Sequence, residues 1–531
     1  MPTLNWIGKE VVVNHHRQVP FHLLKDVHDL SCGEPGDGNL IVQGDNLVAL
    51  KALLPYYASQ VKCIYIDPPY NTGNENWVYN DNVNSPVIRE WLGKVVGKEG
   101  ETLDRHDRWL CMMYPRLTLL RQFLREDGVI FVSIDDYEYE RLKLIMSETF
   151  GPDNHVATFI WKRRTTSDSR NINGISGDHE YVLCYQRAGG FRAQGQAKDL
   201  GKYKNLDNDT RGPWMSDNLT GLANQFERPN LHYEIINPKT GVRYQPHPSR
   251  GWLYGRERMA ELIEDNRILW PNKSTGRPRL KRFISDMQSA TTGFSTVLQA
   301  PGNVEATKEL AEIMGPKAFA FPKPSRLIAL LIEQATTSGD LVLDSFSGSG
   351  TTGHAVMSLN VQLGSNRRFI LVEMEPKIAR EITAERVRRV AEGYKNAKGE
   401  KVEGLGGGFR YCELGEPLFD EHGKIRETVS FGDLARHVYF TETGEPLPRE
   451  RVTKSPFLGD CRGIGVYLLY NGILDDRSAN GGNVLTRSVL ARLPKFDGQK
   501  VIYCAGCLLG KDRLQAERIL VRQTPYEIKV S

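Results

Sequence analysis

The sequence predicts an α/β protein built on a doubly wound, mostly parallel β-sheet, and two observations carry this prediction. Short apolar runs rich in β-branched and aromatic residues occur at residues 61–66, 341–343 and 368–372, as expected for strands buried on both faces of a parallel sheet. Each run is followed by an acidic residue, at the edge of the sheet where open α/β folds bind their ligands. We therefore expect a functional site at the carboxyl ends of these strands.

Asp67, Pro68, Pro69 and Tyr70 follow the first of these runs and suit the binding of an exocyclic amine. The Asp67 carboxylate can accept one amine N–H, and a carbonyl of the proline pair, which lacks backbone N–H groups, can accept the other. The ring of Tyr70 can stack on a base. An ordinary strand-to-turn boundary, with the prolines ending the strand, is the alternative that four residues alone leave open.

A glycine-rich turn follows the second run, at residues 344–352, and leads into a predicted helix at 353–359. Glycines let the backbone approach a ligand closely, and a helix N-terminus offers free N–H groups. No Lys-Ser or Lys-Thr pair follows the glycines, so a phosphate-binding P-loop is not expected. Glu373, at the tip of the third run, is well placed to hold two ribose hydroxyls.

Together these segments resemble the DNA amino-methyltransferases that use S-adenosylmethionine. The order is that of the β class, in which the catalytic Asp-Pro-Pro-Tyr motif precedes the Phe-x-Gly-x-Gly cofactor motif. Residues 44–47, 128–136 and 321–327 extend the similarity, which is greatest to the modification (Mod) subunits of type III restriction-modification systems. The resemblance implies a Rossmann-like methyltransferase fold with permuted motif order.

The resemblance also implies a role for each matched residue. It implies a catalytic role for Asp67, Pro68, Pro69 and Tyr70. It implies S-adenosylmethionine binding by Asp45, Lys323, Ser325, Asp344, Phe346, Gly348, Gly350, Thr351 and Glu373. Asp45 is expected near the cofactor adenine and residues 321–327 beside its methionine part.

Five segments are predicted along the chain. They are an N-terminal leader (1–35), the catalytic half of the methyltransferase core (36–160), a DNA target-recognition domain (161–300), the cofactor half (301–398) and a small α+β C-terminal domain (409–531). Residues 155–161 and 180–185 are predicted to pair as strands that close the sheet, and residues 401–408 have the composition of a linker.

The segment 161–300 carries the basic excess of the chain, with 22 Lys and Arg against 14 Asp and Glu, and four of the eight tryptophans. Clusters such as 162–164 and 277–282 are candidates for phosphate contacts. Composition alone is equally compatible with a solvated basic face. The resemblance favours target recognition, because the recognition domain of the family lies between the two core halves.

The chemistry of these residues favours adenine N6 as the methyl acceptor. Cytosine C5 methylation would need a nucleophilic Cys, typically in a Pro-Cys pair, and the chain has none. Cytosine N4 methylation more often has Ser where this chain has Asp67, so N4 stays open. By resemblance, the protein acts on double-stranded DNA as a homodimer, with one protomer reading DNA while the other methylates, and has a helicase-nuclease restriction partner. A solitary DNA methyltransferase, a DNA-binding module with a retired site and an RNA methyltransferase are the alternatives.

Composition indicates a soluble globular protein, with 40% hydrophobic and 25% charged residues among 531. No apolar run is long enough to cross a membrane and eight scattered cysteines indicate a reduced, cytoplasmic protein. Only the Cys504–Cys507 pair has a metal-ligand spacing, without two further ligands, so no metal is expected. The asparagine-rich loop at 71–84 is expected to act as a lid over the base or the displaced strand.

Overall fold

The computed structural model describes residues 3–33, 38–71, 105–167, 174–273, 275–420, 422, 424–445, 447, 455–470, 473–475 and 482–524. The chain forms two compact units. The first comprises Met1–Ala193 and Ser295–Ser531, and the second comprises Gln194–Phe294.

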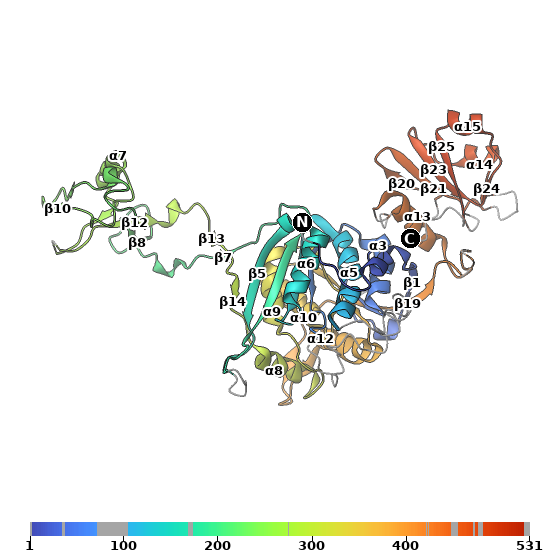
Figure 1. Ribbon diagram of the computed structural model, residues 1–531, viewed down its shortest axis with the longest axis horizontal. Helices are drawn as coiled ribbons and strands as arrows, with labels where there is room; N and C mark the ends of the chain where they lie inside the picture. The colour runs from blue at the N-terminus through green and yellow to red at the C-terminus, as the bar shows by residue number, and fades with distance from the viewer. Residues whose placement is uncertain are drawn as a thin grey trace. The chain divides into compact units, whose positions relative to one another are not determined.

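A ten-stranded sheet lies at the centre of the first unit (Figure 1). Its strands, in spatial order, are β1 (His22–Asp26), β19 (Arg410–Pro417), β2 (Leu40–Gln43), β16 (Arg368–Glu373), β15 (Leu341–Asp344), β3 (Val61–Ile66), β4 (Leu124–Ile134), β6 (His179–Gln186), β5 (His155–Lys162) and β14 (Val297–Leu298). The six strands from β19 to β4 are mutually parallel, whereas β1 and β6 run antiparallel to their neighbours. The predicted fold class, a mostly parallel α/β sheet, is confirmed.

Two groups of helices cover the sheet because its side chains alternate between two apolar faces. Ile64 and Ile66 of β3 belong to the core cluster of the first group, which comprises α3 (Asn46–Tyr57), α5 (Arg105–Phe123) and α6 (Tyr139–Phe150). The second group comprises α8 (Asn303–Met314), α9 (Ser325–Ala335), α10 (Thr351–Leu363) and α12 (Glu385–Glu392), with α9 packed on β3. The short helix α11 (Pro376–Ile378) and the π-helical segment η7 (Ala379–Ala384) precede α12.

Residues 3–33 of the predicted N-terminal leader are integrated into the first unit instead of forming a separate segment. They form α1 (Lys9–Val12), α2 (His15–Gln18) and the edge strand β1, which pairs with β19. Val12, Val19 and Phe21 are buried because they pack into the core cluster of α3 and α5.

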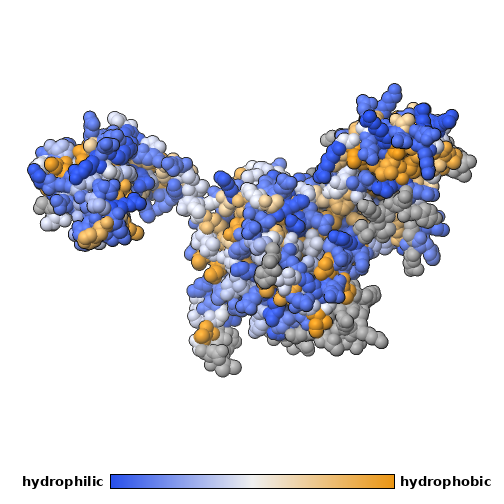
Figure 2. Space-filling model, turned by 45° about the horizontal axis from the view of Figure 1, so that its top comes forward, coloured by the Kyte–Doolittle hydropathy of each residue, from blue (hydrophilic) through white to orange (hydrophobic). Residues whose placement is uncertain are grey.

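The second unit is narrower than the recognition segment predicted at 161–300. The described residues of 161–193 belong to the first unit, because β6 pairs with β5 over residues 179–185 and with β4 over residues 181–186. The second unit contains β7 (Gln196–Ala197), β8 (Trp214–Asn218), β9 (Ile235–Ile236), β10 (Arg243–Tyr244), α7 (Arg256–Glu264), β11 (Ile268–Leu269), β12 (Arg279–Phe283) and β13 (Thr291–Thr292). Its small core gathers around the buried Trp252, and the face visible at the left of Figure 2 is mostly hydrophilic.

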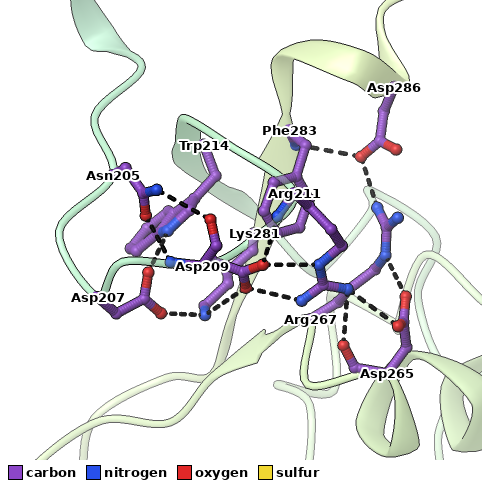
Figure 3. A network of polar contacts seen from close by, with 10 residues as sticks. All are labelled: Asn205, Asp207, Asp209, Arg211, Trp214, Asp265, Arg267, Lys281, Phe283 and Asp286. Atoms are coloured by element: carbon purple, nitrogen blue, oxygen red, sulfur yellow. Dashed lines mark hydrogen bonds and ion pairs between the residues drawn. The ribbon is translucent and has the colours of Figure 1, made fainter.

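Ion pairs supplement this small core (Figure 3). Lys281 of β12 is 4% exposed and forms ion pairs with Asp207 and Asp209. Arg211 binds Asp209 at 2.8 Å and Asp265 at 2.9 Å, and Asp265 also holds Arg267. Lys281, Arg211 and Arg267 therefore neutralise carboxylates of the unit itself.

The C-terminal part of the first unit contains a second, four-stranded sheet. Its order is β20 (Phe457–Cys461), β21 (Ile464–Leu468), β23 (Gln499–Cys504) and β25 (Ile519–Gln523), with the last three strands parallel. Helices α13 (Phe431–Thr443), α14 (Arg487–Arg492) and α15 (Lys511–Ala516) and the pair β22 (Val484–Leu485) and β24 (Gly506–Cys507) accompany it. Residues 410–417, predicted as part of this domain, instead form β19 of the central sheet, and residues 401–403 form β18 (Lys401–Glu403), paired with β17 (Gly393–Lys395). No helix in the described ranges is long and apolar enough to cross a membrane.

Candidate functional site

The two sequence motifs meet because β3 and β15 are adjacent parallel strands. Val342 lies opposite Cys63 and Leu343 opposite Ile64, so the turns that follow the two strands emerge at the same edge of the sheet. A cavity of about 490 Å³ lies there. The residues that line it come from the ends of β3, β4 and β15 and from the segments before β6 and α9.

Nine of the thirteen predicted site residues line this cavity. They are Asp67, Pro68, Pro69, Tyr70, Lys323, Asp344, Phe346, Gly348 and Thr351. The other four, Asp45, Ser325, Gly350 and Glu373, do not line it. Three of these four make side-chain hydrogen bonds that shape the surrounding chain, and Gly350 shapes it through its backbone conformation.

Asp45 and Ser325 act at helix ends in the structure. The Asp45 carboxylate caps α3 by accepting the N–H groups of Leu47 at 2.9 Å and Val48 at 3.1 Å, and it pairs with the buried Arg116 at 3.2 Å. The Ser325 hydroxyl and N–H both donate to Glu309. Their roles in cofactor binding stay predictions.

Glu373 and Gly350 shape the glycine-rich turn. The carboxylate of Glu373, 1% exposed, accepts the N–H of Gly348 at 2.9 Å and the N–H of Glu375 at 3.0 Å. Gly350 has a φ of 74° and precedes α10, and a Cβ there would lie 3.0 Å from the Thr383 carbonyl oxygen. The turn thus needs glycine at 350 for both conformation and space.

A buried charge cluster surrounds Asp67. The Lys323 ammonium lies 2.9 Å and 2.8 Å from the two Asp67 oxygens and donates to the Tyr70 hydroxyl at 2.8 Å. Glu180, at the start of β6 and 5% exposed, lies 3.3 Å from the same ammonium. The indole of Trp109 donates to the Pro69 carbonyl at 2.6 Å, which fixes the double-proline turn.

The glycine-rich turn presents a carboxyl group and hydroxyls to the cavity. Asp344 is 2% exposed and accepts the Thr352 hydroxyl at 2.5 Å and the Phe346 N–H at 2.9 Å. Burial raises the pKa of Asp344 to about 7 although both hydrogen bonds oppose the shift. Ser347 also lines the cavity, and its buried hydroxyl has no hydrogen-bond partner among the described residues. The turn therefore offers a buried carboxyl group and an unsatisfied hydroxyl to a ligand.

The sequence is similar to known DNA-modifying proteins. The family model described as "DNA methylase" matches residues 61–385, which is more than half of the chain and includes both motifs. The chain belongs to the DNA methylase family. Among individual relatives, the type II methyltransferase M.KpnI of Klebsiella pneumoniae is 30% identical over 396 residues, covering 68% of this chain and 89% of M.KpnI.

Type III Mod subunits are also relatives of this DNA methylase. The StyLTI Mod subunit of Salmonella typhimurium is 33% identical over 395 residues, and the EcoP15I Mod subunit of Escherichia coli is 30% identical over 424 residues. The alignments cover 68% and 70% of this chain but 58% and 64% of those Mod subunits. The chain therefore spans less than two thirds of the length of these relatives.

The candidate site contains residues that the sequence did not identify as functional. Glu180, Asp135 and Tyr137 line the cavity together with the aromatic residues of segment 319–321. Arg163, predicted as part of a phosphate-contact cluster, lines it as well. Burial raises the pKa of Asp135 to about 7. Glu180 could have been noticed in the sequence as an acidic residue at the start of an otherwise apolar strand. Its proximity to Asp67, however, depends on the antiparallel pairing of β4 with β6.

The predicted lid at 71–84 lies outside the described residues except for Asn71. Asn71 is buried, has a φ of 59°, and donates to Glu138 at 2.5 Å. The prediction that 71–84 closes over a base stays untested.

The pKa of Asp344 predicts a pH dependence of stability. Because the folded chain binds this proton between pH 3.8 and about 7 and the unfolded chain does not, stability decreases as pH rises through this window and then levels off. The difference amounts to at most about 4 kcal/mol. Asp344→Asn cannot ionise, so its stability should depend less on pH. The Tm of the variant relative to that of the wild type should therefore be higher at pH 8 than at pH 5, as measured by calorimetry of the ligand-free proteins from pH 5 to 8. An equal slope in both proteins would contradict the assignment.

Proposed function

We propose that this DNA methylase transfers a methyl group from S-adenosylmethionine to the N6 atom of adenine in double-stranded DNA. One observation carries the proposal: the Asp67-to-Tyr70 turn and the glycine-rich turn line a single cavity of about 490 Å³. The Asp67-to-Tyr70 turn, which suits an exocyclic amine, thus lies beside the glycine-rich turn, whose backbone a ligand can approach closely. The family match agrees with this reaction class.

The residues of the glycine-rich turn fit a cationic cofactor. The Asp344 carboxyl and the Gly348 backbone line the cavity. The Ser347 hydroxyl also lines it and has no hydrogen-bond partner among the described residues. When bound, S-adenosylmethionine supplies a methyl group on a cationic sulfur, so neither a metal nor an enzyme nucleophile is required. We propose that Asp344, Phe346, Gly348 and Thr351 hold it.

Asp67 and Pro68 would orient the amine of the base. The lone pair of adenine N6 is delocalised into the ring, and acceptance of its two hydrogens by a carboxylate and a carbonyl localises it for transfer. The Pro69 carbonyl already accepts from Trp109, so the Pro68 carbonyl is the second acceptor in this proposal. Tyr70 would stack on the extruded base, which offsets part of the few kcal/mol needed to unstack it.

The proposal is tested by methyl transfer from labelled S-adenosylmethionine to mixed-sequence duplex DNA, with analysis of the modified nucleosides and sequencing of the modified sites. N6-methyladenine is the expected product. N4-methylcytosine would retain the site chemistry and overturn the choice of base. Absence of any product, with DNA and cofactor binding retained, would favour a retired site.

We further propose that the second unit, residues 194–294, recognises DNA. It carries 16 Lys and Arg against 11 Asp and Glu, a net formal charge of +5. Two apolar side chains, Leu222 and Phe226, are 82% and 87% exposed on one short segment beside the exposed Arg228. Cationic and exposed apolar side chains together suit contacts with phosphates and base steps.

The basic cluster 277–282 divides into two kinds of residue. Lys281 is buried against Asp207 and Asp209, and Arg282 pairs with Asp217 at 2.8 Å, so these cations are already neutralised. Arg277 is exposed and makes no hydrogen bond or ion pair within the part of the chain that the structure describes. The fourth cation, Arg279, is held by hydrogen bonds to Ser216 and Asn218. Arg277 is therefore our candidate for a phosphate contact.

Two substitutions distinguish these roles. Lys281→Met should destabilise the second unit, because it removes the buried cation that Asp207 and Asp209 share and leaves Asp209 with Arg211 alone. Arg277→Gln should leave stability unchanged, weaken DNA binding at all sequences and reduce the salt slope of log K by about 1. Hydrogen exchange of residues 194–294 and DNA titrations at several salt concentrations measure the two effects. Loss of DNA affinity in a fully folded Lys281→Met protein would contradict the assignment of Lys281 to a structural role and of Arg277 to the phosphate contact.

We propose that the protein assembles as a homodimer and serves a type III-like system with a helicase-nuclease subunit. The similarity to the two Mod subunits supports this assembly. The high coverage of M.KpnI, a type II methyltransferase, supports the alternative of a methyltransferase that acts without that subunit. Sedimentation of the purified chain with and without DNA tests the dimer.

A further inference from the structure

The Lys323 ammonium occupies the groups that the proposed function assigns to the base. It binds both oxygens of Asp67, at 2.9 Å and 2.8 Å, and lies 4.8 Å from the centroid of the Tyr70 ring. An ammonium donates N–H groups to a carboxylate as an exocyclic amine does. Entry of a base amine onto Asp67 therefore requires that Lys323 leave at least one of these oxygens.

Glu180 provides a second carboxylate within reach of this ammonium. Its Oε2 atom lies 3.3 Å from Lys323 Nζ, and its Oε1 atom lies 3.5 Å from Arg163. The Tyr70 hydroxyl lies 2.8 Å from Asp67 and 3.1 Å from Glu180, so one hydroxyl can also serve either carboxylate. Lys323 and the Tyr70 hydroxyl, which both bind Asp67, can therefore both bind Glu180 instead.

Lys323 needs such an acceptor because its side chain is 9% exposed. Burial alone would lower the pKa of Lys323, but the charges of Asp67 and Glu180 hold it above its ordinary value. A buried ammonium that loses its only carboxylate is strongly destabilised. Displacement from Asp67 is therefore feasible only if another buried carboxylate takes the ammonium over.

We propose that Lys323 is a placeholder for the target amine and that Glu180 is the positioning residue that receives it when the base enters. Without DNA, Lys323 holds the Asp67 carboxylate and the Tyr70 hydroxyl in place. With the base bound, Lys323 and the Tyr70 hydroxyl shift to Glu180 and release Asp67 to accept the N6 hydrogens. This inference rests on the proposed function and assigns Glu180 a role that it exerts through Lys323.

The test is single-turnover methyl transfer by four proteins: wild type, Glu180→Gln, Lys323→Met and the double variant. Glu180→Gln should lower the rate by about 10- to 100-fold, since Asp67 is then the one carboxylate left to Lys323 and the neutral amide oxygen of glutamine is a weaker acceptor for an ammonium. The double variant should transfer faster than Glu180→Gln alone, because the competing ammonium is gone. Glu180→Asp should restore part of the loss.

Two further readouts separate this role from a structural one. The rate of Glu180→Gln should recover as pH rises toward the pKa of Lys323, whereas the wild-type rate should not. Independently of methyl transfer, NMR titration of labelled lysine side chains, assigned with Lys323→Met, should show a lower Lys323 pKa in Glu180→Gln than in the wild type.

The outcomes distinguish this inference from the proposed function. Failure of the wild type to methylate DNA contradicts the proposed function alone, and the NMR titration still decides whether Glu180 holds Lys323. The proposed shift of Lys323 from Asp67 to Glu180 is overturned if Glu180→Gln transfers methyl groups at the wild-type rate. It is also overturned if the double variant is no faster than Glu180→Gln. An unchanged Lys323 pKa overturns it as well.

Discussion

Asp67→Ala is expected to reduce methyl transfer by about 10³-fold or more while cofactor binding persists. Asp67 lies at the end of β3 and is 25% exposed toward the cavity, where its oxygens face the position proposed for the base amine. The groups proposed to hold the cofactor belong instead to the segment from the end of β15 to the start of α10. Loss of the carboxylate should therefore remove the acceptor of the amine and leave the cofactor turn intact.

The measurement is single-turnover transfer together with calorimetric titration of S-adenosylmethionine into the same protein. Asp67→Asn keeps one acceptor oxygen and should retain more activity than Asp67→Ala. Asp136→Ala is the matched control, since Asp136 is an exposed acid after the neighbouring strand β4 and does not line the cavity. Activity of Asp67→Ala comparable to that control would contradict the catalytic assignment.

The sequence predicted the central strands and the convergence of the two motifs because both follow from local patterns. Apolar runs of β-branched residues identified β3, β15 and β16, and the acidic residues after them marked the ligand edge of the sheet. The predicted strands at 155–161 and 180–185 correspond to β5 and β6, which pair antiparallel. These elements have strong local propensity and need no long-range information to be recognised.

The surroundings of Asp67 could not be predicted, because they depend on contacts between distant segments. Lys323 lies 256 positions from Asp67 along the chain, and Glu180 reaches the site through the pairing of β6 with β4. Likewise, the basic cluster 277–282 gave no sign that Lys281 is buried against Asp207 and Asp209. Charge counts register how many cations a segment has, whereas burial and pairing decide which of them remain available to DNA.

The edge strands of the sheet also could not be predicted from local sequence patterns. Residues 22–26 and 410–417 were assigned to separate end domains, but they pair with each other as β1 and β19 and extend the sheet beyond β2. Both strands are only partly apolar, so neither has the continuous apolar pattern that identified β3 and β15. The pairing across almost the whole chain becomes visible only in the folded structure.

Glu373→Gln is expected to weaken cofactor binding by about 10- to 100-fold, the second largest effect. The two Glu373 oxygens accept the N–H groups of Gly348 and Glu375, so both orient the turn that lines the cavity. Glutamine has nearly the same shape but only one acceptor oxygen, and its amide N–H₂ would face a backbone donor. The turn at Gly348 should therefore shift out of its binding conformation even if the carboxylate itself never contacts the cofactor.

Calorimetric titration with S-adenosylmethionine measures this effect, and Glu375→Gln is the control because it makes the same chemical change two residues along the chain. The side chain of Glu375 makes no hydrogen bond or ion pair within the described ranges, and its backbone N–H donor survives the substitution. The control should bind the cofactor like the wild type. Equal affinities of the Glu373→Gln and Glu375→Gln proteins would show that the carboxylate is dispensable both for the turn and for the ribose contact that the resemblance implies.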